Sequence, residues 1–181
     1  MKLLAAARGH RRILDVAAAL ACFAMLGFAF YLQSARHLEP CPLCIFQRVA
    51  VVSLGVAFLV AALLPSLPRA LAWLATTLIA LAALAGAGVS GRHVYIQSLP
   101  PDQVPVCGAT LDYMMEIFSP SEVLRKVLTG SGECAKVDWT FLGLSMPAWV
   151  LICVLLLGVA GVLVNLPAKT GYANRPRSDS R

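Results

Sequence analysis

The chain has 181 residues, of which 59% are hydrophobic and 13% are charged, with a mean hydropathy of +0.77 and a formal net charge of +6. Soluble domains carry about 45–50% apolar and about 25% charged residues, so this composition excludes an ordinary soluble protein and indicates an integral membrane protein. The basic excess does not indicate nucleic-acid binding, because it lies in short flanks and tails around the apolar runs.

Four apolar runs are long enough to cross a bilayer, which takes about 20 helical residues. They cover residues 13–31, 45–64, 70–89 and 146–166. We therefore predict an all-α integral membrane protein, a bundle of four transmembrane helices that forms one domain over residues 1–181. We expect the first run to stay as a span, because it is longer than a secretory signal core of about 7–15 residues and precedes no small-residue cleavage site.

The distribution of Lys and Arg predicts the orientation of this bundle. Nine of the 15 basic residues lie near the two termini or between the second and third runs, whereas segment 91–145 has four basic and six acidic residues. By the positive-inside rule, both termini and the tail 167–181 are expected in the cytoplasm. Two outer loops, residues 32–44 and 91–145, then face away from it.

The first outer loop ends in Pro-Cys-Pro-Leu-Cys, and Arg48 follows Cys44 by one helical turn. The first N–H groups of a helix favour an anion, so Cys44 is expected to be a reactive thiol. Arg48 is either a cation that snorkels to the membrane surface or one that holds a thiolate or an electron-rich carbonyl oxygen. A disulfide between Cys41 and Cys44 closes a very small loop, which argues against a purely structural role.

The third run and the second outer loop carry packing and helix signals. Ala82, Gly86 and Ser90 recur at four-residue spacing, which predicts close helix packing. Ser119-Pro120-Ser121-Glu122 predicts a capping box at the start of a short amphipathic helix, and residues 111–118 predict another. Both are too short to span, so we expect them on the membrane surface or against the bundle. The aromatic segment 139–149 predicts a return along the interface.

The six cysteines divide by position. Cys22 and Cys153 fall inside apolar runs, where a thiol behaves as a small apolar filler. The other four fall in the outer loops, where disulfides persist: Cys41, Cys44, Cys107 and Cys134. Four cysteines allow three pairings; local spacing favours Cys41–Cys44 with Cys107–Cys134, but sequence alone does not choose. Both pairs as structural staples remain an alternative.

A zinc site is a further alternative. The four outer cysteines, with His37 or His93 nearby, would supply a tetrahedral set of ligands. However, Cys107 and Cys134 lack the usual spacing of zinc ligands, and the loops face an oxidising space. We therefore expect no metal.

Taken together, these residues resemble the DsbB family over nearly the whole chain. The resemblance rests on four spans, on Cys-Pro-Leu-Cys-Ile-Phe-Gln-Arg after the first, on a cysteine pair in the long outer loop, and on Trp-Thr-Phe-Leu-Gly-Leu-Ser-Met-Pro-Ala-Trp before the fourth. It implies a bacterial inner-membrane protein-disulfide oxidoreductase. Such an enzyme reoxidises the soluble periplasmic thiol oxidase DsbA and passes the electrons to a membrane quinone, either ubiquinone or menaquinone.

The resemblance also implies a role for each outer cysteine. Cys107 would form the mixed disulfide with DsbA, and Cys134 would exchange with Cys41. Cys44 would then be the thiolate that contacts the quinone. Arg48 and His93 match family positions beside the quinone.

The same residues are compatible with two other functions. A membrane scaffold, stapled by two disulfides, would bind a periplasmic partner without redox turnover. A quinone reductase similar to the vitamin K epoxide reductase family also has a CxxC pair in a helical bundle. Its active pair lies late in the chain, whereas Cys41 and Cys44 lie at the start of the second span.

Overall fold

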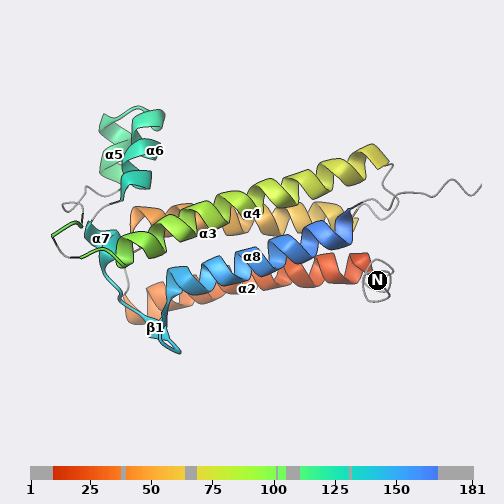
Figure 1. Ribbon diagram of the computed structural model, residues 1–181, viewed down its shortest axis with the longest axis horizontal. Coiled ribbons are helices and arrows are strands. Elements are labelled where there is room, and N and C mark those ends of the chain that lie inside the picture. The colour runs from red at the N-terminus through yellow and green to blue at the C-terminus, as the bar shows by residue number, and fades with distance from the viewer. Residues whose placement is uncertain are drawn as a thin grey trace, which may run out of the picture.

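The computed structural model describes residues 10–37, 40–63, 69–100, 102–104, 111–130 and 132–166. Four long helices run along the molecule (Figure 1): α2 (Arg11–Arg36), α3 (Pro42–Leu63), α4 (Arg69–Gln97) and α8 (Met146–Asn165). All four are long and apolar enough to cross a membrane. The predicted all-α, four-helix membrane fold is confirmed. The predicted turn between the second and third spans and the C-terminal tail lie outside the described residues.

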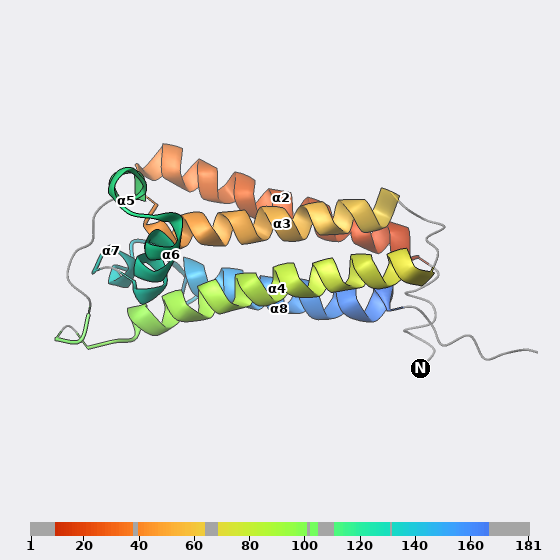
Figure 2. The ribbon, with the colours of Figure 1, turned by 90° about the horizontal axis from the view of Figure 1, so that it is seen from above.

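The helices form two layers, α2 with α3 and α4 with α8 (Figure 2). The most extensive contacts join α4 to α8 and α3 to both α2 and α4, whereas α2 and α8 touch less. The centre of the bundle is filled by side chains that are at most 1% exposed, among them Leu54, Phe58, Ile79 and Val154. This core sets the four helices in a fixed order around the bundle.

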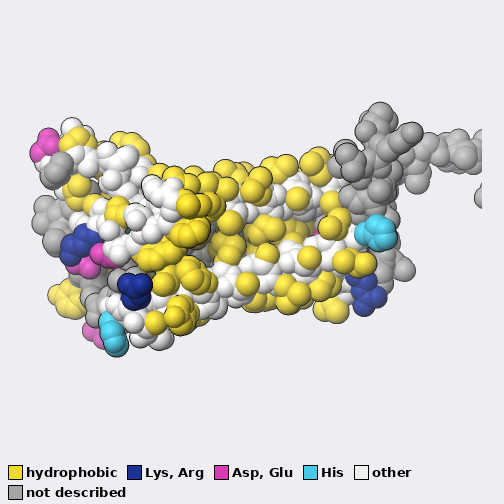
Figure 3. Space-filling view, turned by 90° about the horizontal axis from the view of Figure 1, so that it is seen from below, with side chains coloured by type: hydrophobic (Ala, Val, Ile, Leu, Met, Phe, Trp, Pro, Cys, Tyr) yellow, Lys and Arg dark blue, Asp and Glu magenta, His cyan; other side chains and the backbone are white. Residues whose placement is uncertain are grey.

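The outside of the bundle is also apolar. Ile13, Leu20, Leu84 and Leu156 are each more than half exposed. Figure 3 shows hydrophobic side chains along the whole length of the bundle and charged ones at its two ends. An apolar surface of this extent suits lipid rather than water, because soluble monomers rarely expose large contiguous apolar patches.

Glycines let α8 approach α4 closely. A Cβ added at Gly158 would lie 2.5 Å from the Cβ of Ala83, and one added at Gly86 would lie 3.0 Å from Val154. Gly86 belongs to the small-residue series predicted from the sequence, and Ser90 of the same series is fully buried. The close packing predicted for this helix is therefore present, and α8 is its partner.

Three of the long helices, α2, α3 and α4, extend beyond the apolar runs that predicted them. α4 continues to Gln97, and α2 continues to Arg36 before His37 adopts the left-handed conformation at φ 51°. α3 already begins at Pro42, because proline suits the first turn of a helix. An apolar run measures the thickness of the membrane, whereas a helix ends at its capping residue. As a result, Cys44 and His93 lie on helices.

The second outer loop folds into short elements at one end of the bundle (Figure 1): α5 (Leu111–Ile117), α6 (Pro120–Thr129), α7 (Gly132–Ala135), β1 (Thr140–Phe141) and β2 (Leu144–Ser145). The predicted capping box is present, since the Glu122 carboxylate accepts hydrogen bonds from the Ser119 N–H (3.2 Å) and hydroxyl (2.9 Å). α6 buries one face through Val123 and Val127.

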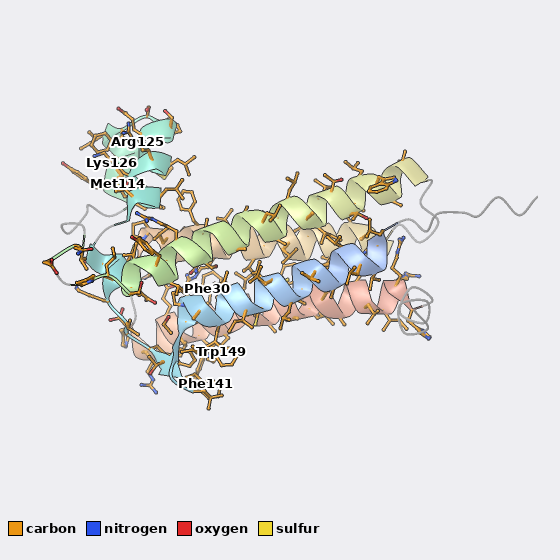
Figure 4. All side chains as sticks on the ribbon, viewed as in Figure 1. Phe30, Met114, Arg125, Lys126, Phe141 and Trp149 are labelled. Carbon is orange, nitrogen blue, oxygen red and sulfur yellow. The ribbon has the colours of Figure 1, made fainter. Side chains whose placement is uncertain are left out.

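The predicted return along the interface is a hairpin of β1 and β2. Its two turn residues, Leu142 and Gly143, both have positive φ, as a two-residue hairpin requires. The hairpin packs on α8, since the Trp149 indole N–H donates a 3.0 Å hydrogen bond to the Phe141 carbonyl (Figure 4). Trp139 stacks on Phe141 with ring centroids 6.0 Å apart, which completes an aromatic corner.

A buried polar cluster lies at the opposite end of the bundle. Asp15, Thr76 and Asn165 are each at most 4% exposed. The Asn165 amide donates a 2.8 Å hydrogen bond to Asp15, and the Thr76 hydroxyl donates a 3.0 Å bond to the Asn165 carbonyl. Arg11 lies 3.7 Å from the Asp15 carboxylate. The cluster therefore joins α2, α4 and α8 through polar contacts.

Candidate redox site

The CxxC pair caps the start of α3. Cys41 precedes Pro42, and Cys44 lies in the first turn of the helix. Their sulfurs are 3.2 Å apart, and the Cys44 backbone N–H donates a 3.4 Å hydrogen bond to the Cys41 sulfur. Proline at the first helical position fixes this geometry, and the free N–H groups of the first turn surround the sulfurs with positive partial charge.

Cys134 comes to the same place from the second outer loop. α7 carries it against α3 and α4, where its side chain is 1% exposed and hydrogen-bonds to that of Cys41. The hydrogen bonds with Cys134 and with Cys44, together with burial, raise the pKa of the Cys41 thiol. Three of the four predicted cysteines thus meet at one point, with Cys41 between the other two. Cys107 lies outside the described residues.

Arg48 is one turn deeper on α3 and is held by α2. Its guanidinium donates a 2.7 Å hydrogen bond to the Gln33 side chain and a 3.4 Å bond to the Ala29 carbonyl. It also lies over the ring of Phe30, 4.7 Å from the centroid (Figure 4). These contacts fix the cation within the bundle rather than leaving it to extend toward water.

His93 faces the thiols from α4. Its Nε2 is 3.1 Å from the Cys134 carbonyl oxygen and 3.8 Å from the Cys41 sulfur. The side chain is 2% exposed. The family resemblance implied that His93 lies beside a quinone, but nothing in the sequence indicated that the imidazole contacts the backbone of the second outer loop.

A cavity of about 370 Å³ adjoins the CxxC pair. Cys41, Cys44, Arg48 and His93 all line it. Mostly apolar side chains of α2, α3 and α8 also line it, together with Glu133 and residues 136–139 of the second outer loop. The volume is within the usual range of about 300–1,000 Å³ for a small-molecule pocket, and apolar walls with a few polar groups are typical of such pockets.

Gln47 is a cavity residue that the sequence analysis missed. Its side chain is 5% exposed, and its Nε2 has no hydrogen-bond partner among the residues that the structure describes. A buried amide donor is normally paired, so this one is available to an acceptor in the cavity. Its three-residue spacing from Cys44 placed it on the same side of the helix, but nothing in the sequence marked that side as the wall of a cavity.

A second hollow, of about 650 Å³, borders Cys134 from the loop side. Met114, Arg125 and Lys126 of α5 and α6 line it, as labelled in Figure 4. Cys134 therefore lies between two spaces. It borders the loop hollow directly and reaches the bundle cavity through its hydrogen bond with Cys41.

The cysteines and the histidine of this site also bear on the alternative of a zinc site. The donor atoms of Cys41, Cys44 and His93 lie within 4.8 Å of one another, which is close enough to share an ion. A closed structural zinc site uses four ligands, and no fourth Cys, His, Asp or Glu donor among the described residues lies within this distance of all three. Thiol–disulfide exchange needs sulfurs that lie close together, and the Cys41 and Cys44 sulfurs, 3.2 Å apart, meet that need.

Comparison with known proteins supports disulfide chemistry. A family model described as disulfide bond formation protein DsbB matches residues 11–164. Relatives called disulfide bond formation protein B include one from Methylococcus capsulatus, 52% identical over 145 residues that cover 80% of this chain and 87% of the relative. One from Hahella chejuensis is 50% identical over 139 residues (74% and 80% covered), and one from Acinetobacter baumannii is 49% identical over 138 residues (76% and 81%).

Proposed function

Because the chain belongs to the DsbB family and is therefore a multi-pass membrane disulfide oxidoreductase, we propose that it oxidises a soluble, DsbA-like periplasmic dithiol protein and transfers the electrons to a membrane quinone. Both termini would lie in the cytoplasm and both outer loops in the periplasm. The observation that carries the proposal is the position of Cys41, hydrogen-bonded to both Cys44 and Cys134 beside a cavity at the membrane edge.

The proposed relay uses two disulfides. The partner's thiolate attacks the Cys107–Cys134 disulfide at Cys107, which releases Cys134 as a thiolate. Cys134 then attacks Cys41, the Cys41–Cys44 bond breaks, and Cys44 leaves as a thiolate facing the cavity. Attack by the partner's second thiolate frees Cys107 and completes the partner's disulfide. Cys107 re-forms its bond with Cys134, which releases Cys41 to pair again with Cys44 as two electrons leave through Cys44.

The residues of the cavity fit a quinone ring. The pocket has a suitable volume, and the unpartnered Nε2 of Gln47 and the fixed guanidinium of Arg48 would both bind carbonyl oxygens. A bound quinone would supply a two-electron acceptor, with uptake of two protons. Arg48 would also stabilise the Cys44 thiolate by its charge, and the apolar walls would exclude water. Ubiquinone and menaquinone both present this chemistry.

Reconstitution with a reduced DsbA-like protein and quinone tests the proposal. We expect Cys44→Ser to abolish oxidation of the partner, because the Cys41–Cys44 disulfide that passes electrons to the quinone can then no longer form. Cys153→Ser is the matched control and should turn over at the parent rate, since this cysteine lies on α8 away from the cluster. Undiminished turnover by Cys44→Ser would show that the proposed mechanism is wrong.

A further inference from the structure

The outer end of α4 holds the second outer loop by its backbone carbonyls. Arg92 donates hydrogen bonds of 2.9 Å to the carbonyls of Leu128 and Thr129, at the end of α6. Gln97 donates a 3.4 Å bond to the Lys136 carbonyl, just beyond α7. The His93 bond to the Cys134 carbonyl lies between these contacts. Three side chains of one helix thus fix the backbone on both sides of α7.

α7 needs such support because it has only four residues. One helical turn is not stable by itself, since nucleation of a helix is unfavourable. The position of Cys134 therefore depends on what its backbone contacts. The described contacts of α7 are mainly with α4 and α3, and His93 makes the buried one.

The His93 contact fixes both a distance and a tautomer. The Cys134 carbonyl is an acceptor, so Nε2 must carry the proton that it donates. The same nitrogen lies 3.8 Å from the Cys41 sulfur. One imidazole N–H therefore touches both the backbone of Cys134 and the side chain of Cys41, the two cysteines that must react with each other in the proposed relay.

We propose that His93 is a positioning residue for exchange between the two cysteine pairs. Its Nε2–H holds α7 so that the Cys134 sulfur stays in line with Cys41. This inference rests on the proposed relay, and it assigns His93 to the sulfur-exchange step in addition to the wall of the cavity. In that step the Cys134–Cys41 bond forms, the Cys41–Cys44 bond breaks, and the electron pair leaves on Cys44 as one thiolate replaces another.

The step can be measured without partner or quinone. In full-length Cys107→Ser protein that carries the Cys41–Cys44 disulfide, Cys134 is free to attack Cys41. Acid quenching, alkylation and peptide mapping then give the rate and the yield of the Cys41–Cys134 disulfide. Because neither external reactant is present, this assay can fail while reconstituted turnover succeeds, or succeed while turnover fails.

Three substitutions in this background test the role of the imidazole. His93→Phe keeps a ring but removes the N–H, and we expect Cys41–Cys134 formation to slow at least tenfold, because small misplacements of reacting groups have large effects on rate. His93→Gln retains an N–H donor and should recover most of the loss. Tyr95→Phe, two residues along and 53% exposed, should behave as the parent.

Hydrogen exchange of residues 132–136 gives a second readout. Loss of the His93 contact should speed amide exchange in this segment, while α8 stays protected. Formation of Cys41–Cys134 by His93→Phe at the parent rate would overturn the proposal, as would a loss in His93→Phe that His93→Gln does not recover although both variants fold.

Discussion

Gln47 places a hydrogen-bond donor, unpaired among the described residues, in the wall of the cavity. Its Nε2 is buried without a partner in the part of the chain that the structure describes. An unsatisfied buried donor costs about 1–3 kcal/mol, which a carbonyl oxygen of a bound molecule would recover. We therefore expect Gln47 to reduce stability slightly and to strengthen the binding of the proposed quinone.

Gln47→Leu should separate these two effects. We expect the ligand-free variant to melt at the same temperature as the parent or higher, and to bind quinone about tenfold more weakly, as for loss of about 1.4 kcal/mol. Thermal melts in detergent, with and without quinone, measure both quantities. Ser53→Ala on the exposed side of α3 is the control. Unchanged quinone affinity in Gln47→Leu would contradict the prediction.

Substitution of Arg48 should have a different effect on the kinetics, because directed hydrogen bonds fix the position of its charge. We expect Arg48→Ala to raise the KM for quinone at least tenfold and to leave the KM for the dithiol partner nearly unchanged. Arg48→Lys should recover little, since a lysine does not reproduce the planar fork that binds Gln33 and Ala29. Steady-state kinetics with each substrate varied in turn gives both values. Equal quinone KM values in Arg48→Ala and the parent would reject this role.

At the scale of elements, local signals predicted the helices and the close packing around Gly86, but not the other contacts between helices. The apolar runs predicted four spans, and Ser119 with Glu122 predicted the start of α6. The burial of Gln47 had no such signal, because α3 is apolar on all sides and its pattern does not mark one face. The meeting of Cys134 with Cys41 depends on packing between distant segments, which leaves no local pattern.

The α4–α8 contact predicts a large effect for a small substitution. In Gly158→Ala the added methyl would lie 2.5 Å from the Ala83 Cβ, so the helices must separate. Overpacking of this kind costs about 1–3 kcal/mol. Gly27→Ala adds a methyl with nothing within 4 Å and should be neutral or stabilising by about 0.5–1 kcal/mol. Unfolding in mixed micelles compares the two; equal effects would contradict the packing argument.

The α6 capping box predicts a pH response that is confined to the loop. Hydrogen bonds from the Ser119 hydroxyl and backbone N–H hold the pKa of Glu122 below its usual value. A carboxyl group whose pKa is lower in the folded than in the unfolded state stabilises the fold at pH values above the unfolded-state pKa. This stabilisation is lost as the pH falls through the folded-state pKa. Amide exchange in α6, corrected for intrinsic rates, should therefore speed up in acid. Glu122→Gln caps without titrating and should lack this response; the same response in both would exclude the carboxylate as its source.

On the scale of the whole molecule, the two ends of the bundle have different tasks. Figure 1 shows α5, α6 and α7 at one end of the bundle, and the start of α2 and the end of α8 at the other. Cys134 belongs to α7 and borders the thiols and the cavity, whereas Asp15 belongs to the start of α2 and Asn165 ends α8. Polar groups buried in a membrane bundle are costly unless paired, so this cluster fixes the register of three helices.

Asn165→Leu tests this division. The substitution removes the donor to Asp15 and the fold should lose about 1–3 kcal/mol. At temperatures where the variant is folded, turnover should match the parent, because distant sites act nearly independently. Thermal inactivation and kcat at low temperature measure the two properties. A fall in kcat without a fall in stability would show that the ends are coupled.

Cys41 touches two other sulfurs but bonds to only one of them at a time. In the proposed relay, Cys41 therefore forms a disulfide either with Cys134 or with Cys44. While Cys41 is joined to Cys134, Cys44 faces the cavity as a thiolate, and two electrons leave only when Cys41 pairs with Cys44 again. The loop pair is then re-formed and can react with the next partner. Loading and discharge are thus kept in order by the valence of one sulfur, without a moving domain.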